Sequence, residues 1–530
     1  MNRTKKKWVS SMAIVPLLAG VLAGCSGGNN GEPAPAANNS GVQSKEPAAP
    51  VELTVFRWDY EGIDSPDSAI YKRLQEKLNI KLKPIVASWN DWEEKLNVMI
   101  GTGDMPDIFV SSGIGRPVQY NQWIREGLVL NLSDYTTEYP NLGKSLANFE
   151  VLTKPTGGKH YGLPIFNESG SGKNSINGHN ILIRKDWLDK LGLKAPTTID
   201  EFYKVAKAFT DNDPDGNNKK DTYGFSSSSS GNPVFWFYPI FNAFDASTDR
   251  FKKTADGKFE PEVISPGMEQ GISFLNKMNK EKILDPDFMV NTDEQKMEKF
   301  ITGKVGMIVN NLNSWFYTDI TNKLKKAYPD RDPKSIFTWV GTLKGANGQQ
   351  RMDGSPNFWL QTSVKADLPD DKKKKALELL DYLLSEEGQD LVLNGVEGVH
   401  YKVEGDKKVP IMAAEERDKD KGFLLKSLVS WNTDFLPEGL ENREEIIAAA
   451  KSTGDYAVPN PLEYMVIPED ALDSSLPGEL GDYVNQRLAE IIVNSKDVPA
   501  DFSKYKEEWL KKGGTKLVEE TNKQAAAEGR

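Results

Sequence analysis

The apolar positions of residues 51–110 follow two alternating spacings. Strand-like apolar runs occupy 51–58 (VELTVFRW), 80–88 (IKLKPIVAS) and 108–110 (IFV). The segments between them, 67–80 and 91–102, place apolar side chains three or four residues apart, as one face of a helix requires. This β-α-β-α-β order predicts a parallel sheet with helices on its faces.

Ligands of open parallel sheets lie beyond the carboxyl ends of the strands. In this chain those ends carry aromatic and small polar side chains, which suit a sugar because pyranose rings have apolar C–H faces and hydroxyl rims. The residues at these ends are Trp58, Asp59 and Tyr60 at the first run, Trp89 after the second, and Ser111 and Ser112 after the third. All of them except Ser111 are predicted to bind the ligand. Core packing is the alternative role for each tryptophan.

The amino terminus has the pattern of an export signal. A basic stretch that ends at Lys7 precedes the apolar run 9–21, which is shorter than the roughly 20 residues that cross a bilayer. Leu22-Ala23-Gly24-Cys25 resembles the lipobox of bacterial lipoproteins, which implies cleavage before Cys25 and diacylation of its thiol. The alternative is an ordinary signal with a chance cysteine. Residues 1–24 are therefore expected to be a lipoprotein signal peptide.

Residues 25–50 are expected to be a lipidated cysteine followed by a flexible tether. The segment is rich in Gly, Asn, Ser, Ala and Pro and has almost no large apolar side chain, so it cannot bury enough surface to fold. Cys25 is the only cysteine of the 530 residues, which excludes an intramolecular disulfide and a cysteine metal cluster. The protein is expected on the extracytoplasmic face of the cell membrane, held there by its lipid.

The length that remains beyond the tether, about 480 residues, exceeds one compact core and suits two lobes. Removing residues 1–24 takes four of the 66 basic side chains and no acidic one, so 62 basic side chains face 77 acidic ones, a net charge of −15. This acidic balance argues against nucleic acid and against peripheral binding to anionic lipid as partners.

Six blocks along the chain then carry a family resemblance. The blocks at 96–110, 157–165, 180–209 and 303–316 resemble bacterial extracellular solute-binding proteins of family 1, the substrate receptors of carbohydrate ABC importers. Those at 384–401 and 505–524 resemble the large lipoprotein subgroup of LplA/LipO-like proteins. The resemblance implies an α/β, periplasmic-binding-protein-like fold of class II. It also implies an oligosaccharide ligand, neutral or uronic-acid-containing, and delivery by a monomer to ABC permease subunits.

That fold has two α/β lobes joined by a multi-crossing hinge, with the ligand cleft between them. Breaks in the pattern place the crossings near 163–178, 309–311 and Pro356. The N-terminal lobe is then expected to comprise 51–165 plus 310–356, and the C-terminal lobe 166–309 plus 357–530.

A polar loop, DNDPDGNNKKDTYGF (211–225), has the spacing of a calcium site. Counted as an EF-hand-like loop, it offers oxygen ligands from Asp213, Asp215, Asn217, Lys219 (through its carbonyl) and Asp221. It departs from the EF-hand at position 12, where Gly224 replaces a bidentate glutamate. It is similar to the calcium loop of alginate-binding proteins of this family, which implies a structural Ca²⁺. A plain Asx turn is the alternative.

Further ligand contacts are expected from residues beside the predicted crossings. Trp315 lies in a block resembling the one that carries a sugar-stacking tryptophan in maltose-binding protein. The other candidates are Trp236, Arg351, Asp353, Trp359 and Trp431.

The sequence does not favour an enzyme. Its three histidines lie outside any recognised catalytic motif, and it has neither a phosphate-binding loop nor a dinucleotide fingerprint. Paired carboxylates say little in a chain with 77 acidic side chains. No catalytic residue is therefore predicted. A surface glycoside hydrolase or lyase and an oligopeptide receptor stay open as alternative functions.

Overall fold

The computed structural model of the chain describes most of the compact unit Ala49–Arg530, which is separate from the unit Met1–Ala48. The described ranges are 49–88, 91–112, 117–149, 152–153, 156–166, 175–176, 179–228, 234–311, 314–355, 358–430, 443–463, 465–468, 471–473 and 475–530. Within these ranges no helix is long and apolar enough to cross a bilayer. Cys25 and the tether lie outside them.

The first sheet has the strand order β2-β1-β3-β13-β4. Its strands are β1 (Val51–Trp58), β2 (Ile80–Ala87), β3 (Ile108–Ser111), β4 (Leu163–Phe166) and β13 (Phe358–Val364). β1 pairs in parallel with β2 and β3, whereas β13 runs antiparallel to β3 and β4. The parallel sheet predicted from residues 51–110 is therefore confirmed.

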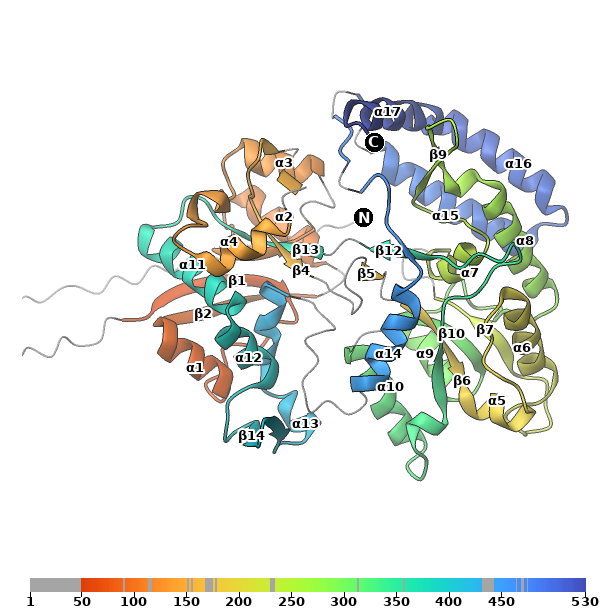
Figure 1. Ribbon diagram of the computed structural model, residues 1–530, viewed down its shortest axis with the longest axis horizontal. Helices are drawn as coiled ribbons and strands as arrows, with labels where there is room; N and C mark the ends of the chain where they lie inside the picture. The colour runs from red at the N-terminus through yellow and green to blue at the C-terminus, as the bar shows by residue number, and fades with distance from the viewer. Residues whose placement is uncertain are drawn as a thin grey trace, which may run out of the picture. The chain divides into compact units, whose positions relative to one another are not determined.

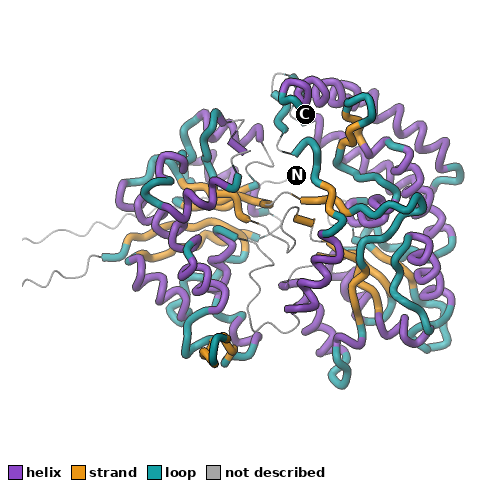
Figure 2. The backbone as a smooth tube through the Cα atoms, viewed as in Figure 1, coloured by secondary structure: helices purple, strands orange, loops and turns teal. Residues whose placement is uncertain are grey.

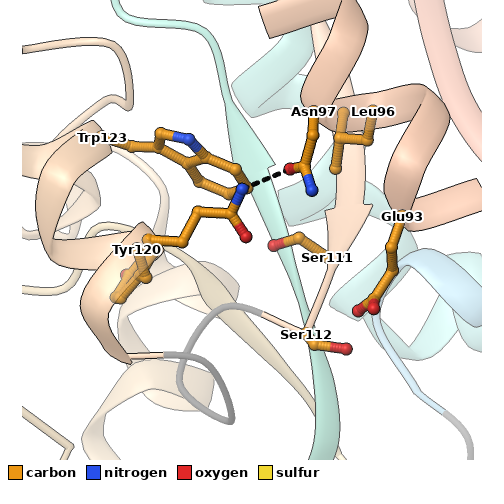
Figure 3. A pocket seen from close by; sticks show the side chains of 8 residues that line it. Glu93, Leu96, Asn97, Ser111, Ser112, Tyr120 and Trp123 are labelled. Carbon is orange, nitrogen blue, oxygen red and sulfur yellow. Dashed lines mark hydrogen bonds between the residues drawn. The ribbon is translucent and has the colours of Figure 1, made fainter. Parts of the chain in front are cut away.

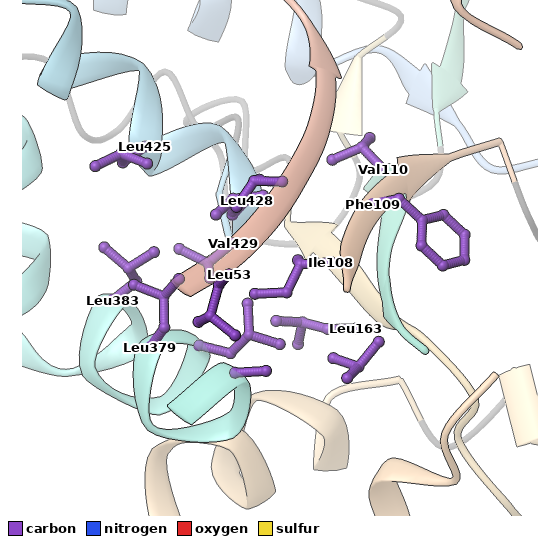
Figure 4. Close-up of a cluster of buried hydrophobic side chains, with 14 of the residues drawn as sticks. Leu53, Ile108, Phe109, Val110, Leu163, Leu379, Leu383, Leu425, Leu428 and Val429 are labelled. Atoms are coloured by element: carbon purple, nitrogen blue, oxygen red, sulfur yellow. The ribbon is translucent and has the colours of Figure 1, made fainter. Parts of the chain in front are cut away.

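Helices and one hairpin complete this first lobe (Figure 1). The helices are α1 (Ala69–Leu78), α2 (Trp92–Thr102), α3 (Pro117–Arg125), α4 (Pro140–Ala147), α11 (Asp370–Leu384), α12 (Glu386–Asn394), α13 (Ala414–Arg417) and the 3₁₀ segments η2 (Leu132–Tyr135) and η7 (Lys421–Leu428). The hairpin joins β14 (Tyr401–Glu404) to β15 (Lys407–Pro410). One core cluster, part of which is drawn in Figure 4, joins Leu53 and Ile108 of the sheet to Leu379 of α11 and Leu428 of η7.

The second sheet has the order β11-β6-β10-β7. Its strands are β6 (His179–Arg184), β7 (Tyr223–Ser226), β10 (Val305–Asn311) and β11 (Phe337–Val340). The helices of this second lobe are α5 (Lys185–Leu191), α6 (Ile199–Asp211), α7 (Tyr238–Ala243), α8 (Pro266–Lys280), α9 (Asp293–Ile301), α10 (Ser314–Ala327), α14 (Arg443–Gly454), α15 (Leu476–Asn494), α16 (Val498–Trp509) and α17 (Thr515–Ala527). Shorter pieces are η4 (Phe235–Phe237), η5 (Glu262–Ile264), η6 (Pro333–Ser335), η8 (Leu510–Gly514) and the hairpin of β8 (Phe251–Lys253) and β9 (Phe259–Pro261). The class II, two-lobed α/β fold expected from the resemblance is the fold observed.

A small third sheet, β16-β12-β5, lies where the chain changes lobes. It contains β5 (Ser175–Ile176), β12 (Met352–Ser355) and β16 (Ala457–Val458). β5 and β12, labelled in Figure 1, are drawn as strands at the same places in Figure 2. The chain leaves the first sheet after β4 and returns to it at β13. It leaves again after η7, which packs on α1, α11 and α12.

The strand pairings place two segments in the sheet of the lobe opposite to the one expected from the sequence. β11 pairs with β6, so 337–340 belongs to the second sheet, and β13 pairs with β3 and β4, so 358–364 belongs to the first. No change of lobe occurs at 309–311, because β10 is followed by α10, which packs on α9. Polar breaks mark where a strand ends, but an apolar run has the same pattern whichever sheet it enters.

Asp420 ties the start of α1 to the segment that precedes η7. Its carboxylate accepts hydrogen bonds from Ser68 Oγ, from the backbone N–H of Ala69 at 3.0 Å and from that of Gly422 at 3.0 Å. His400 Nε2 lies 3.3 Å from the same carboxylate. Burial acts to raise the pKa of Asp420, but the bonds from His400 and Ser68 outweigh it and lower the pKa.

We expect Asp420→Asn to lower the free energy of unfolding at pH 7 by about 1–3 kcal/mol, because a charged acceptor of several hydrogen bonds is lost. A carboxyl whose pKa is depressed by folding stabilises the protein above its unfolded pKa, and this contribution disappears as the pH falls. The difference between wild type and variant should therefore shrink below about pH 4. Urea unfolding at several pH values measures it, with Asp406→Asn, at an exposed aspartate of the β14–β15 turn, as control. An unchanged difference at low pH would contradict the assignment.

Candidate functional site

The carboxyl ends of β1 and β3 lie side by side at one edge of the first sheet. The register pairs Val55 with Ile108 and Phe56 with Phe109, so the two strands end next to each other, at Trp58 and Ser111. The strand order β2-β1-β3 places both ends at the edge where ligands of parallel sheets bind. This carboxyl edge is the candidate functional site.

The aromatic residues at the end of β1 and just beyond it are packed inside the lobe. Trp58 is 3% exposed, its ring centroid lies 4.9 Å from that of Trp92, and the Arg57 guanidinium carbon lies 3.9 Å from the Trp58 ring. Tyr60 is fully buried, with its hydroxyl 3.1 Å from Ser427 Oγ. Asp59 between them is exposed and has a left-handed backbone with φ of 62°. The structure thus gives both rings a packing role, and their contact with a ligand stays a prediction.

A narrow pocket opens beside the end of β3 (Figure 3). It is lined by Glu93, Leu96, Asn97, Ser111, Ser112, Gln119, Tyr120 and Trp123. Its volume of about 10 Å³ suffices for roughly one water molecule. The pocket is therefore a small polar depression at this edge of the sheet. In this conformation it is too small to hold a sugar ring.

The structure adds polar groups that sequence reasoning missed. α2 and α3 face each other across the pocket, and Gln119 Nε2 donates to Asn97 Oδ1 at 2.5 Å. Tyr120 bonds to the side chain of Gln361 in β13, and burial raises the pKa of its hydroxyl. Ser112 was predicted from its place after a strand, whereas no local signal places α3 beside α2.

The predicted residues Arg351 and Asp353 are brought together in a buried ionic cluster. Arg351 donates to Glu262 Oε2 at 2.7 Å, to Asp353 Oδ1 at 2.9 Å and to Asp245 Oδ1 at 3.0 Å. Arg250 Nε lies 3.4 Å from Asp353. Burial acts to lower the pKa of Arg351, but the carboxylates of Asp353 and Glu262 outweigh it and raise the pKa.

This cluster borders a cavity of about 320 Å³. Its lining includes Arg250, Lys252, Glu262, Gln350, Arg351 and Pro459. Because Arg351 and Asp353 already bond to protein partners, the structure shows a structural role for both. Ligand contact from the cavity stays a prediction.

In the second lobe, Trp236 is 8% exposed, and Lys296 Nζ lies 4.0 Å from its ring centroid. Trp315 belongs to the first turn of α10 and Trp359 to β13, but their side chains are outside the described part of the chain. Trp89 and Trp431 lie wholly outside it. Ligand contact from these tryptophans therefore stays a prediction.

The predicted calcium loop folds around the side chain of Asn217. The Asp213 carboxylate accepts from the backbone N–H groups of Asn217 at 3.1 Å and Asn218 at 3.0 Å. Asn217 Nδ2 donates to Asp215 at 2.7 Å and to Asp221 at 3.0 Å, and its Oδ1 accepts from the backbone N–H of Lys219 at 2.8 Å. The backbone N–H groups and the Asn217 side-chain amide therefore lie between the carboxylates. A metal-binding loop holds its cation at this position.

The charges of this loop are partly balanced by the protein. Lys304 Nζ lies 2.6 Å from Asp221, whose pKa it lowers. Burial raises the pKa of Asp215, and the neighbouring carboxylates of Asp221 and Asp213 contribute. In the described ranges no three His, Cys, Asp or Glu side chains are grouped so that they would hold a metal ion. The atoms that this loop offers to a metal ion are nevertheless all oxygens, which are the ligands that Ca²⁺ prefers.

Comparison with known proteins gives consistent matches along the chain. The sequence profile described as bacterial extracellular solute-binding protein matches residues 62–390. The polygalacturonan/rhamnogalacturonan-binding protein YtcQ of Bacillus subtilis (strain 168) is 28% identical over 536 residues, covering 97% of this chain and 98% of that protein.

Solved structures match the fold. The ABC-transporter substrate-binding protein FusA of S. pneumoniae in complex with kestose has a TM-score of 0.71 at 20% identity, covering 90% of this chain and 99% of that chain. An EF-hand mutant of FusA in complex with fructo-nystose has a TM-score of 0.67 at 20% identity, with the same coverage.

We expect Arg351→Met to lower the free energy of unfolding by about 3–5 kcal/mol, because it leaves Glu262 and Asp353 buried without their cation. Lys253→Met, at an exposed lysine of β8, is the control and should change stability by less than about 0.5 kcal/mol. Urea unfolding measures both. Full stability in Arg351→Met, combined with a loss of ligand affinity, would instead assign Arg351 to ligand binding.

Proposed function

Because the chain belongs to the bacterial extracellular solute-binding protein family, we propose that it captures an oligosaccharide outside the cytoplasm and delivers it to the membrane subunits of an ABC importer. The observation that carries the proposal is the two-lobed fold with a polar and aromatic carboxyl edge on its first sheet. The alignment with a saccharide-binding protein over 97% of the chain supports it.

The carboxyl edge has suitable chemistry for reading a saccharide. Hydroxyl and amide groups of Ser112, Asn97 and Gln119 can exchange hydrogen bonds with sugar hydroxyls, and Trp123 and Tyr120 supply apolar rings. Ligand sites of this kind combine a largely apolar lining with a few placed polar groups. Binding of the saccharide between the lobes favours a closed arrangement that the permease recognises. No bond is made or broken, and ATP hydrolysis belongs to a separate subunit.

We assign the remaining contacts by the family resemblance. Trp315 is proposed to stack on a sugar ring, and Trp58, Asp59, Tyr60, Trp89, Trp236, Trp359 and Trp431 are proposed to complete the site. Cys25 is proposed to carry the lipid that holds the protein at the membrane.

The test is a screen of the melting temperature of the chain from residue 26 against neutral oligosaccharides, uronic-acid oligosaccharides and short peptides. A ligand that binds only the folded state stabilises it by about 2.7 kcal/mol at 100 times its Kd. We expect a shift with one saccharide class, with the saccharide recovered intact by chromatography. Shifts with peptides alone would contradict a saccharide receptor, and shortened saccharide would indicate a hydrolase or lyase.

We also propose that the loop 213–221 binds a structural Ca²⁺ through Asp213, Asp215, Asn217, the Lys219 carbonyl and Asp221. The crowding of Asp213, Asp215 and Asp221 supports this, because burial and the neighbouring carboxylates raise the pKa of Asp215, and a divalent cation would stabilise its charged form. The ion would stabilise the loop that connects α6 to β7, so its role would be structural.

We expect Ca²⁺ added after chelation to raise the melting temperature of the wild type. In Asp213→Ala/Asp221→Ala the rise should vanish, because two of the three carboxylates are gone. Asp211→Ala, at an exposed aspartate that pairs with Lys207 outside the loop, is the control and should keep the rise. A wild type that does not respond to Ca²⁺ would show the loop to be a plain turn.

A further inference from the structure

The cavity of about 320 Å³ beside Arg351 is large enough for a small ligand. Sites that bind small molecules enclose roughly 300–1,000 Å³. Most of the lining comes from three segments that are far apart in the sequence, namely β8, the residues 349–351 and the residues 458–461, which begin in β16. The cavity therefore forms only when these segments are packed together.

The charged groups that border the cavity already serve one another. The ionic cluster contains three cations and three carboxylates, namely Arg250, Lys252 and Arg351 with Asp245, Glu262 and Asp353. Because these charges balance, a ligand without net charge leaves the cluster as it is. An ionised ligand would add an unbalanced charge to it.

Two acceptor oxygens at the cavity stay unused by the protein. Arg351 donates to Oε2 of Glu262 at 2.7 Å, and no described residue donates to Oε1 of the same carboxylate. Gln350 donates through Nε2 to the carbonyl of Thr342 at 2.9 Å, which leaves its own Oε1 as an acceptor. Burial raises the pKa of Glu262, although Arg351 acts to lower it. A donor from a ligand would replace the water that this carboxylate has lost.

Donors line the same cavity. The buried Nε2 of Gln349 has no hydrogen-bond partner in the described part of the chain, so the fold makes no use of this donor. Lys253 is exposed and forms no ion pair with a described residue. A hydroxyl group both donates and accepts hydrogen bonds, so the hydroxyls of one sugar can use these donors and the two free acceptors together.

The cavity also has an apolar wall, formed by Phe251, Val458, Pro459 and Pro461. Val458 is 43% exposed, and both prolines are exposed as well. Apolar surface next to a few placed polar groups is typical of small-molecule sites. The C–H face of a sugar ring would cover such a wall.

We propose that this cavity is a subsite for an uncharged sugar unit of the cargo. The inference rests on the saccharide-receptor function proposed above, and it names where one unit is held and of which class that unit is. A sugar hydroxyl donates to Glu262 Oε1, and another accepts from Gln349. An acidic unit is disfavoured, because an ionised carboxylate has no proton to donate and repels that of Glu262.

A single thiol at the cavity wall tests this subsite. Cys25 is the only cysteine of the protein, so the chain from residue 26 has none and Val458→Cys supplies the only thiol. The probes are kestose, with uncharged units, oligogalacturonate, with acidic units, and a rhamnogalacturonan oligosaccharide, with both. Titration calorimetry gives their Kd values, and the rate of maleimide labelling reports access to the cavity.

We expect kestose or the rhamnogalacturonan oligosaccharide to slow labelling of Val458→Cys about tenfold at ten times its Kd, because only unliganded protein reacts. Val493→Cys, at a 37% exposed valine of α15 away from the cavity, is the matched control and should react at the same rate with and without saccharide. Equal protection by oligogalacturonate would overturn the preference for an uncharged unit.

Gln349→Leu keeps the size of the side chain and removes its amide. We expect it to weaken binding of the protecting saccharide about threefold to tenfold, the loss of one hydrogen bond, and to leave the melting temperature without saccharide unchanged or higher. Gln270→Leu, at an exposed glutamine of α8, is the control and should not change the affinity. A lower melting temperature together with weaker binding of every probe would show a structural amide and overturn the proposal.

Two further outcomes separate this inference from the function on which it rests. Binding of a saccharide without protection of the thiol in Val458→Cys would overturn the subsite and leave the receptor function standing. Binding of no saccharide, here or in the screen above, would overturn both.

Discussion

The pairing of β13 with β3 and β4 is the constraint on which the rest of the structure depends. β13 lies between two strands from much earlier in the chain, so the first sheet is complete only after the chain has passed through all four strands of the second sheet. The connections between lobes follow from this order. A rearrangement of one lobe is transmitted through backbone that belongs to a sheet of the other.

The spacing of apolar residues correctly predicted the strands and helices of residues 51–110 in the first lobe. The strands β1, β2 and β3 and the helices α1 and α2 follow directly from apolar spacing, because each is adjacent in sequence to its partner. The return of 358–364 was not predicted, since a buried strand is apolar whichever sheet it joins. Likewise α3 carries no signal that it faces α2, and so Asn97 and Gln119 were missed.

Aromatic residues show a related limit of sequence reasoning. Trp58 and Tyr60 follow a strand at the ligand-binding edge, and the sequence cannot decide between stacking on a sugar and packing in the core. Their burial is decided by η7 and by Trp92, and η7 comes from a distant part of the chain. Charged residues are similar: Arg351 and Asp353 are two positions apart, but Glu262 and Asp245 join them only through the tertiary fold.

The ionic cluster of Arg351 shows what such long-range packing contributes. Its carboxylates come from three segments, Asp245 after α7, Glu262 in η5 and Asp353 in β12, and Arg351 contacts all three at 2.7–3.0 Å. Removing the arginine would leave buried carboxylates without their cation, which costs more than the complete cluster gains. The cluster is therefore favourable only when all of these segments are in place.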